Sequence, residues 1–374
     1  MESYVNFLYI AFRDIMPCLN DFKTLLYYVN ISCDRLYMNK MNQLIQTPEI
    51  VAKAYSRIES YIRKTPILHS NVLNKMLDSK IYFKMDAVQK TGAFKIRGVL
   101  NHLLALKEQN KLPKAIVAYS TGNHALAMSY AARLFEIRAR AYLPKNVSPI
   151  KKHIADYYGA EVVEVDTRRE AEEAAKNDGE EDFHYLHPSD DDETIAGAGT
   201  MCYEALLEML QMGIKPDAIF GPCGGGGLLA GSYLAKELLS PKTELHGVEP
   251  KLANDAFQSL NSEDIFRFKD SPETIADGLR SLSVSKRTLA YLKRLDGFHL
   301  ADEESIRYWT ECLIQMMKVT CEPSAAISMS AAHSWLKNNS KGKVILIPIT
   351  GGNIDPEFYQ KLCGSDKYLE DIPF

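Results

Sequence analysis

The sequence predicts an α/β fold made of two lobes, each an open twisted parallel sheet with flanking helices. From residue 114 onward, short apolar runs of strand length alternate with segments of helical composition, the order expected for parallel strands with right-handed crossovers. Polar or glycine-rich turns follow three predicted strands, at residues 120–124, 221–227 and 350–353. Because ligands of open α/β sheets bind at the carboxyl ends of strands, these turns predict one shared site.

The first predicted helix covers residues 47–63, where Thr47 can cap the helix and Pro48 suits its first turn. A short strand follows at 82–85. The later predicted strands are 114–119, 139–144, 161–165, 217–220, 244–248 and 343–349. The later predicted helices are 124–135, 149–158, 167–176, 228–239, 302–317 and 322–336.

The domain boundaries follow from the polar block Ser189–Glu193, which fits a linker between two lobes. We expect a large domain of residues 47–112 and 191–374, and a small mobile domain of residues 113–190, within the 374-residue chain. Residues 1–46 are interpreted as an extension of uncertain structure. Charges interrupt its apolar runs well short of the ~18 residues that a membrane-spanning helix needs, and it lacks the early basic residues of a signal peptide.

Composition narrows the class of protein. A net charge of −4 argues against a nucleic-acid-binding surface, which needs a basic excess. The seven cysteines form no CxxC pair or metal-finger spacing and are interpreted as reduced thiols. We therefore expect a cytoplasmic protein that binds neither nucleic acid nor membrane.

Lys95 is the candidate nucleophile. It follows Phe94 in the turn Thr91–Gly98, between a short strand and a helix. A lysine placed behind an aromatic ring loses solvation, which disfavours its charged form and lowers its pKa. Such an amine attacks carbonyl groups and forms Schiff bases. The alternative is an exposed lysine at a helix start, the usual position of a lysine.

The run Gly224–Gly227 opens a helix directly after a strand, which suits an anion such as phosphate. No Lys-Ser/Thr pair follows, so it is not a nucleoside-triphosphate loop. The spacing of Gly225, Gly227 and Ala230 also fits the dinucleotide fingerprint, with Glu249 where a ribose-binding acid would lie. The run alone leaves a phosphate cradle and a nicotinamide site equally open.

Two further turns offer ligand groups. Ser120–His124 presents hydroxyl, amide and backbone N–H groups at a helix start and suits a carboxylate, although capping alone explains it too. For His124, a single satisfied hydrogen bond is the preferred role. Glu249 and Asp255 are spaced for a hard cation such as Mg²⁺ or Ca²⁺, while their spacing alone favours a solvated acidic loop.

Together these stretches resemble the fold-type-II pyridoxal-phosphate enzymes, specifically the threonine/serine dehydratase and serine racemase group, whose fold is like that of the tryptophan synthase β subunit. The resemblance runs from about residue 47 to 360. The matching stretches are Thr91–Gly98, Ser120–His124, His187–Asp191, Ile195–Thr200, Gly224–Gly227, Ile275–Gly278, Glu322–Ala326 and Thr350–Asn353.

The resemblance implies roles for individual residues. Lys95 would carry pyridoxal 5′-phosphate as a Schiff base, Phe94 would pack on its ring, and Asn123 would bond its 3′-oxygen. Gly224, Gly225, Gly226 and Gly227 would hold the phosphate, and Thr350 would face the pyridine nitrogen. Ser120, Thr121, Gly122, Asn123 and His124 would bind the substrate carboxylate. Glu249, the Ala253 carbonyl and Asp255 would bind Mg²⁺ or Ca²⁺, which demotes the nicotinamide alternative.

The implied activity is deamination of L-threonine, L-serine or a related 3-hydroxy amino acid to a 2-oxo acid and ammonia, with Lys95 as general base. Serine racemisation is the alternative on the same fold, and a non-catalytic binding relative is a third. Thr121 bears on the choice between the first two, because racemases have a serine there as a second proton donor and many dehydratases have alanine. A threonine keeps the hydroxyl but stiffens χ1, which counts against racemisation without excluding it. Ala93 and Ala198 also depart from the family's usual residues. A homodimer is expected by resemblance.

Overall fold

The computed structural model describes residues 44–120, 122–145, 147, 149–178 and 183–363. The chain divides into two units, Met1–Ile45 and Gln46–Phe374, and the fold is that of the second unit. The predicted extension at residues 1–46 lies almost wholly outside the described residues. Within the described ranges, no helix combines the length and apolarity needed to cross a bilayer.

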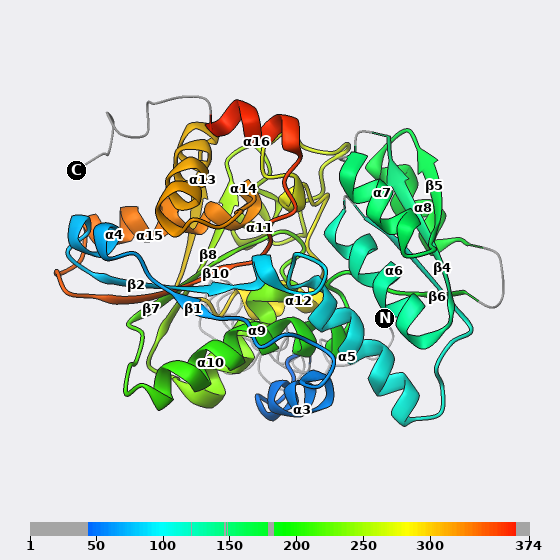
Figure 1. Ribbon diagram of the computed structural model, residues 1–374, viewed down its shortest axis with the longest axis horizontal. Coiled ribbons are helices and arrows are strands. Elements are labelled where there is room, and N and C mark those ends of the chain that lie inside the picture. The colour runs from blue at the N-terminus through cyan, green and yellow to red at the C-terminus, as the bar shows by residue number, and fades with distance from the viewer. Residues whose placement is uncertain (1–43, 121, 146, 148, 179–182, 364–374) are drawn as a thin grey trace, which may run out of the picture. The chain divides into compact units, whose positions relative to one another are not determined.

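A six-stranded sheet forms the larger lobe (Figure 1). Neighbouring strands are parallel except at one edge, where β1 pairs antiparallel with β2. The order across the sheet is β1 (Ile67–Leu68), β2 (Lys80–Met85), β10 (Val344–Ile349), β7 (Ala218–Pro222), β8 (Glu244–Pro250), β9 (Gly297–Ala301). The central strands are buried, as expected for parallel strands covered on both faces.

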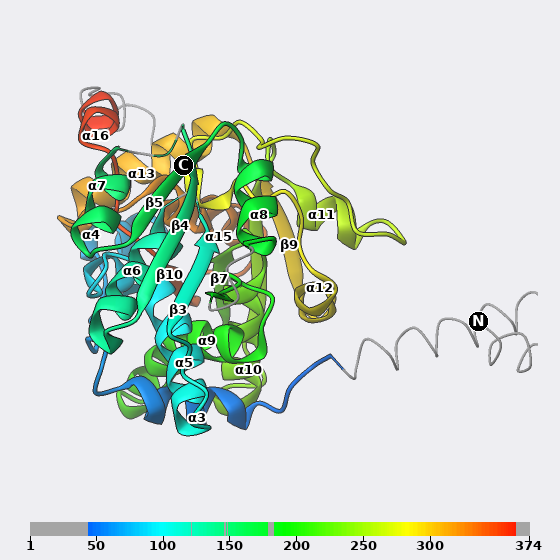
Figure 2. The same ribbon diagram turned by 90° about the vertical axis from the view of Figure 1, so that its right-hand side faces the viewer.

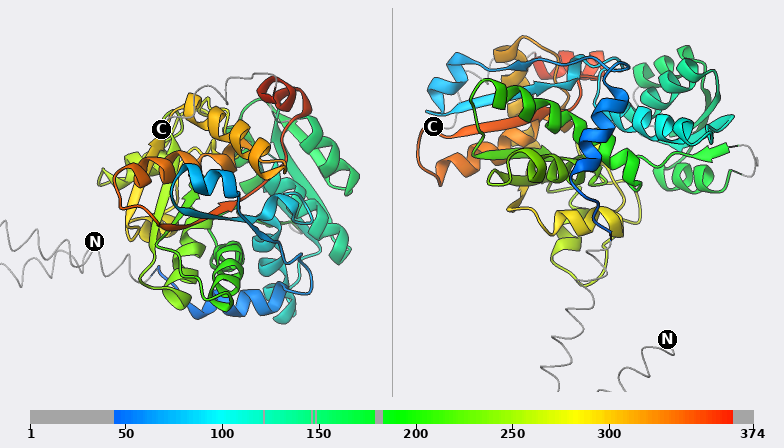
Figure 3. Two further views of the ribbon diagram at one scale, coloured as in Figure 1. Left: turned by 60° about the vertical axis from the view of Figure 1, so that its left-hand side comes forward. Right: turned by 90° about the horizontal axis from the view of Figure 1, so that it is seen from below.

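Helices cover both faces of this sheet (Figure 1). α9 (Asp192–Gln211) and α10 (Gly227–Leu239) cover one face, while α13 (Glu303–Met317) and α15 (Ser328–Lys337) cover the other. α3 (Glu49–Ile58) packs beneath α9 and α10 (Figure 3). The remaining helices of this lobe are α4 (Asn71–Met76), α11 (Asp255–Leu260), α12 (Lys286–Leu292), α14 (Pro323–Ala326) and α16 (Pro356–Cys363).

The smaller lobe is a four-stranded parallel sheet (Figure 2). Its order is β5 (Glu161–Val165), β4 (Arg138–Pro144), β3 (Ala115–Tyr119), β6 (Phe183–Tyr185). α6 (Asn123–Phe135) and α7 (Pro149–Tyr157) lie on one side of the sheet and α8 (Arg168–Lys176) on the other. Two sheets of mainly parallel strands, flanked by helices, confirm the predicted fold class.

α5 (Lys95–Glu108) joins the two lobes. Its apolar face packs into the core of the smaller lobe, while its other side fits closely against α9. The fit depends on glycine: a Cβ on Gly197 would come within 2.5 Å of the Arg97 carbonyl oxygen and 2.7 Å of the Gly98 Cα. The two helices therefore touch through their backbones.

Most strands and helices predicted beyond residue 114 are present within one or two residues of their predicted ends. The first helix is shorter than predicted, because it ends at Ile58 and has no side-chain cap from Thr47. The helix predicted at 322–336 is two helices, α14 and α15, divided at Ile327. The 20-residue α9 and the strand β6 were not predicted; both are short of the apolar periodicity that marks their neighbours.

Candidate active site

The predicted convergence of the three turns is present as a cavity of about 240 Å³ at the carboxyl ends of the strands. It lies between residues of both lobes, so any movement of one lobe changes its width. The sequence-predicted residues that line it are Phe94, Lys95, Ser120, Asn123, His124, Gly224, Gly225, Gly226, Gly227 and Thr350. Thr121 lies outside the described residues.

Lys95 is the first residue of α5 and points into this cavity. Its Nζ donates to the Pro188 carbonyl oxygen at 3.2 Å and lies 5.0 Å from the centre of the Phe94 ring. Burial lowers the pKa of Lys95 to about 8, with a further contribution from the nearby Arg168 cation. No ion pair with a carboxylate accompanies it in the described part of the chain. The lowered pKa and the ring contact agree with the prediction from sequence.

The glycine run follows β7 and opens α10 at Gly227. Gly226 has a φ of +82°, in the left-handed region, which glycine adopts readily because it has no side chain. A Cβ on Gly225 would lie 2.3 Å from the Ser189 hydroxyl oxygen. The glycines thus bring the loop against the segment that joins the lobes, and they leave the N–H groups of a helix start facing the cavity.

The Ser120–His124 turn carries a similar helix start, that of α6. Gly122 has a φ of +142°, and its N–H donates to the Ser120 hydroxyl at 2.9 Å. His124 is buried and donates from Nε2 to the Leu186 carbonyl oxygen at 3.0 Å. Burial lowers its pKa to about 3, so the ring is neutral. The preferred interpretation of His124, one satisfied hydrogen bond, is confirmed.

Glu322 is a cavity residue to which the sequence assigned no role, although it begins a motif quoted for the resemblance. Its Oε1 accepts from Asn123 Nδ2 at 2.8 Å, and its Oε2 lies 3.9 Å from the buried Lys151 amine. Lys151 also pairs with Asp277 at 2.6 Å. Burial raises the pKa of Glu322 to about 7, against the lowering effect of Lys151. No sequence motif indicated a role for Lys151 on α7, because its partners Asp277 and Glu322 are distant in the sequence and belong to the other lobe.

Charged side chains of α8 line a different wall of the cavity. Glu172 accepts from Lys176 at 2.6 Å and from Arg267 at 2.9 Å. Arg168 also lines this wall and is 9% exposed. Three cations share this wall with Glu172, while Asp190 also lines the cavity and pairs with Arg287. No sequence motif pointed to this wall.

Glu249 and Asp255 form a second buried group, and both are 0% exposed. The prediction of a solvated acidic loop is therefore wrong, because β8 carries Glu249 into the interior. Glu249 accepts from the backbone amides of Ala256 and Phe257 at 3.1 and 2.9 Å, so it cannot meet a ribose as the dinucleotide alternative required. Ala253 is also fully buried.

The carboxyl groups of Glu249 and Asp255 disfavour each other's ionisation. Burial and then the Asp255 charge raise the pKa of Glu249 well above its usual range, and burial raises that of Asp255 to about 7. Neither Asp255 oxygen makes a hydrogen bond of normal geometry. Burial and the charges of both carboxyl groups raise the pKa of the neighbouring Cys223 thiol. This thiol supplies no positive charge to the pair. Two buried carboxyl groups that form no ion pair with the described residues are an arrangement that a hard divalent ion fits.

Comparison with known proteins agrees with this geometry. The family described as "Pyridoxal-phosphate dependent enzyme" matches residues 58–351. L-threo-3-hydroxyaspartate ammonia-lyase of Saccharomyces cerevisiae is 35% identical over 85% of this chain and 97% of its own. Serine racemase of Dictyostelium discoideum is 34% identical over 83% of this chain and 96% of its own.

Solved structures give the same result. The threonine deaminase of T.th. superimposes with a TM-score of 0.77 at 38% identity, covering 83% of this chain and 99% of that chain. Maize serine racemase does so with a TM-score of 0.77 at 33% identity, covering 87% and 98%. With the match of the family over most of the chain and relatives of this similarity, the protein belongs to the pyridoxal-phosphate-dependent enzymes.

Proposed function

We propose that this enzyme is an ammonia-lyase that converts a 3-hydroxy amino acid to a 2-oxo acid and ammonia. The observation that carries the proposal is the Lys95 amine, with a pKa of about 8, in a cavity that also contains the Thr350 hydroxyl and two helix starts. Pyridoxal phosphate, when bound, supplies an aldehyde that bonds to amines and a ring that withdraws electrons from the substrate's α-carbon.

The residues present fit this cofactor. Lys95 would bond to its aldehyde, Phe94 would stack on its ring, and the N–H groups of Gly224–Gly227 would receive its phosphate. Asn123 is held by Glu322 and by Asn353, whose Nδ2 donates to the Asn123 Oδ1 at 2.9 Å. This fixes the Asn123 amide, whose second N–H hydrogen would bond the 3′-oxygen of the cofactor.

The chain's own groups then divide the chemistry between them. A Lys95 amine with a pKa of about 8 is partly neutral near pH 7 and can accept the substrate's α-proton. The α6 start, with Ser120 and Asn123, would hold the α-carboxylate. Thr350 offers a hydroxyl where a carboxylate would stabilise a protonated ring nitrogen, and a neutral ring is a milder electron sink, which favours β-elimination over transamination.

The electropositive wall specifies the substrate further. Arg168, Lys176 and Arg267 outnumber Glu172 on this wall. The other two lining carboxylates, Asp190 and Glu322, lie beside Arg287 and Lys151, so the cavity suits a second carboxylate on the substrate. Among 3-hydroxy amino acids this favours 3-hydroxyaspartate, the substrate named for the yeast relative. A hydrogen bond to a charged group contributes about 1.5–3 kcal/mol, enough to rank substrates by one to two orders of magnitude.

A divalent cation is part of the same proposal. Glu249, the Ala253 carbonyl and Asp255 would hold Mg²⁺ or Ca²⁺. Both carboxyl groups are buried, which raises their pKa values, so a bound cation would stabilise their ionised forms. The pair lies beside Cys223, which directly precedes the glycine run. A bound cation would keep both carboxylates ionised and brace the loop that receives the phosphate. We also propose a homodimer and a small mobile lobe of residues 113–190.

Product analysis tests the activity. Purified holoenzyme with Mg²⁺ is incubated with L-threo-3-hydroxyaspartate, L-serine and L-threonine, and 2-oxo acid and D-amino acid are quantified separately. We expect 2-oxo acid in excess, formed with the highest kcat/KM from 3-hydroxyaspartate. A predominance of D-serine would instead make the enzyme a racemase, the activity of the Dictyostelium relative.

A matched pair of variants tests the substrate assignment. Arg168→Met removes a cavity cation, whereas Arg169→Met removes its exposed neighbour, which pairs with Glu173 outside the cavity. We expect Arg168→Met to lower kcat/KM for 3-hydroxyaspartate about 10- to 100-fold more than for serine. Equal losses for both substrates would show that Arg168 does not read a second carboxylate.

A further inference from the structure

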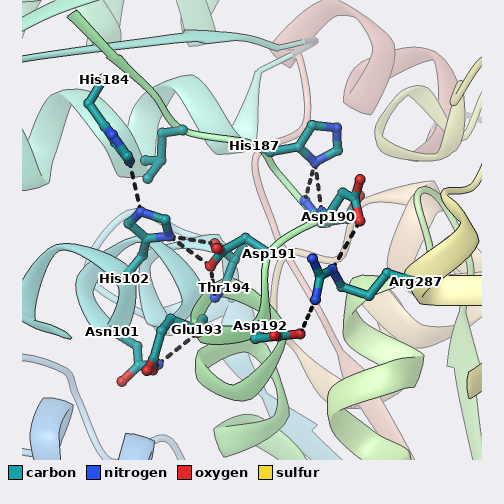
Figure 4. Close-up of polar contacts among 12 residues, drawn as sticks. Asn101, His102, His184, His187, Asp190, Asp191, Asp192, Glu193, Thr194 and Arg287 are labelled. Atoms are coloured by element: carbon teal, nitrogen blue, oxygen red, sulfur yellow. Dashed lines mark hydrogen bonds and ion pairs between the residues drawn. The ribbon is translucent and has the colours of Figure 1, made fainter. Parts of the chain in front are cut away.

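A pair of histidines outside the cavity joins α5 to β6 (Figure 4). His102 of α5 and His184 of β6 face each other with their Nε2 atoms 2.9 Å apart. On its other side, His102 Nδ1 is 2.8 Å from Asp191 Oδ1. Asp191 is the N-cap of α9, where it also accepts from the Thr194 backbone amide at 2.8 Å. The three side chains form one line from the smaller sheet to the start of α9.

This line joins three elements, β6, α5 and the start of α9. His102 belongs to α5, which touches α9 through the backbones at Gly98 and Gly197. His184 belongs to the smaller sheet, where it lies in register with Ile116 of β3. The contact between the two rings therefore joins β6, and the segment that follows it, to α5.

The chain segment that follows His184 contacts residues of the candidate active site. Just beyond His184, the Leu186 carbonyl accepts from His124, and the Pro188 carbonyl accepts from Lys95. Ser189 follows and packs against Gly225. Residues 186–191 thus form a hinge segment that is fixed at one end by the histidine pair and contacts the cavity in its middle.

The number of protons on the pair decides whether this contact exists. Two ring nitrogens at 2.9 Å need one hydrogen between them, so one must donate and the other accept. Asp191 takes the hydrogen on His102 Nδ1, which leaves His102 Nε2 to accept from His184 when both rings are neutral. One added proton can be accommodated, with His102 donating on both sides. Two added protons place two N–H groups against each other and break the contact.

We propose that His102 and His184 form a proton-sensitive latch between α5 and the strand β6 with its following segment, which is closed while one facing nitrogen lacks a proton and opens when both carry one. When it opens, the hinge segment loses its attachment to α5, while the apolar face of α5 stays packed in the core of the smaller lobe. The hydroxyl of Thr194, 3.4 Å from His102 Nδ1, and the Asp191 carboxylate remain with the larger lobe.

The charges around the pair set the direction of the pH dependence. Burial, and then His102, lower the pKa of His184, against the opposing effect of Asp191. The hydrogen bond and charge of His102 hold the pKa of Asp191 at about 2 despite its burial, so this carboxylate stays ionised. His124 on α6 also feels His102 and stays neutral, with a pKa of about 3. A lowered histidine pKa means that the latch is closed at neutral pH and opens as the pH falls through that pKa.

A neighbouring anchor of the hinge segment provides a contrast. Arg287 of α12 pairs with Asp190 and Asp192 at 3.2 and 2.5 Å (Figure 4). An arginine stays charged at every relevant pH, so this anchor persists through the range in which the histidines titrate. Acidification should therefore loosen residues 183–188 while residues 190–192 stay held.

Hydrogen exchange of the holoenzyme, followed by mass spectrometry, tests the latch without reference to any substrate. Rates are measured from about pH 8 to about pH 5 and corrected for the intrinsic pH dependence of exchange. In the wild type, we expect corrected exchange in peptides covering residues 183–188 to rise about threefold or more on acidification. Peptides from the buried strand β10 should not change.

Variants of the two histidine pairs make the test specific. His184→Gln can still donate to His102 but cannot gain a proton, so its exchange should match the neutral wild type at every pH. His299→Gln alters the other histidine pair, where His246 Nδ1 lies 3.1 Å from His299 Nε2, far from the hinge, and it should keep the wild-type response. If His184→Gln does not fold, His102→Gln serves the same purpose. The same acid response in the glutamine variant and the wild type, or no response in the wild type, would overturn the latch.

Discussion

Two regions of buried charge differ in how their charges are balanced. In the first, Arg97 pairs with Asp86 at 2.6 Å and with Glu204 at 3.1 Å, and Lys84 pairs with Glu204 at 2.5 Å. All four side chains are at most 2% exposed. Two cations and two carboxylates therefore balance each other within the protein.

The second region comprises Lys95 in the candidate active site and the separate Glu249–Asp255 pair, where the charges are not balanced locally. Lys95 contacts a carbonyl oxygen and an aromatic ring, and Arg168 is a nearby cation that lowers its pKa further. Glu249 and Asp255 are two buried carboxyl groups that form no ion pair within the described ranges. Burying an unpaired charge is costly, which is why we propose that a bound cofactor and a bound ion compensate for these groups.

The comparison separates residues that support the fold from residues that hold ligands. Lys84 and Lys95 are both buried lysines, eleven positions apart, and burial lowers the pKa of both. They differ in that Glu204 offsets the effect at Lys84, while nothing of opposite charge does so at Lys95. We expect substitutions of these lysines to have opposite consequences.

Lys95→Ala should give the largest effect. It removes the group that would bond the cofactor and accept the α-proton, so we expect kcat for 2-oxo acid formation to fall about 10⁴-fold or more. The unfolding free energy of the cofactor-free chain should be unchanged or higher, because the substitution removes a buried amine that has no carboxylate to balance it. Residual activity within about tenfold of wild type would place the chemistry elsewhere.

Lys84→Met should act on stability instead. It leaves Glu204 with Arg97 alone, and breaking a buried ion-pair network costs about 3 kcal/mol or more. Denaturant unfolding of the cofactor-free chain measures this loss, while kcat of the folded holoenzyme should stay close to wild type. If activity fell as far as in Lys95→Ala with stability intact, the proposed division between the two regions would be wrong.

The sequence located most of the second region and little of the first. Lys95, the glycine run and Thr350 stand in local patterns whose chemistry can be interpreted directly. Lys84, Glu204 and Lys151 meet partners from distant elements, and nothing in their immediate neighbours signals those contacts. The same reason explains the error at Glu249: spacing in a turn suggested a solvated loop, while the sheet buries it.

The fold shows the same limit. Strands and helices with regular apolar periodicity were predicted to within one or two residues, as with α6 and α8. α9 was missed because Gly197, Ala198 and Gly199 lack large apolar side chains; their role is to bring backbones together. Close helix packing through glycine lowers the hydrophobic periodicity by which helices are recognised.

Removal of divalent cation should have a smaller effect, on stability. If Glu249 and Asp255 hold Mg²⁺ at about 100 times its Kd, the ion contributes about 2.7 kcal/mol, which EDTA removes. Thermal unfolding with Mg²⁺ and with EDTA measures the difference. Asp255→Asn should abolish it, whereas Asp302→Asn, at an exposed helix cap, should not. Equal melting temperatures of the wild type in both conditions would rule out the cation.

The smallest expected effect is on the pH dependence of the rate at which the chain binds its cofactor. Only a neutral amine attacks an aldehyde, so the rate at which the cofactor-free chain takes up pyridoxal phosphate should rise about tenfold per pH unit and then level off. Because burial lowers the pKa of Lys95, we expect the plateau to begin at about pH 8. A rate that keeps rising toward the ordinary lysine value of about 10.5 would mean that Lys95 is solvated in the free enzyme.

The most direct measurement is to locate the cofactor's attachment. The holoenzyme is reduced with borohydride, which fixes the cofactor to the lysine it occupies, then digested and analysed by peptide mass spectrometry. The account predicts one modified residue, Lys95, with Lys84 unmodified although it is buried too. Modification of another lysine with Lys95 intact would contradict the assignment of Lys95, and with it the proposed division of buried charge into structural and functional regions.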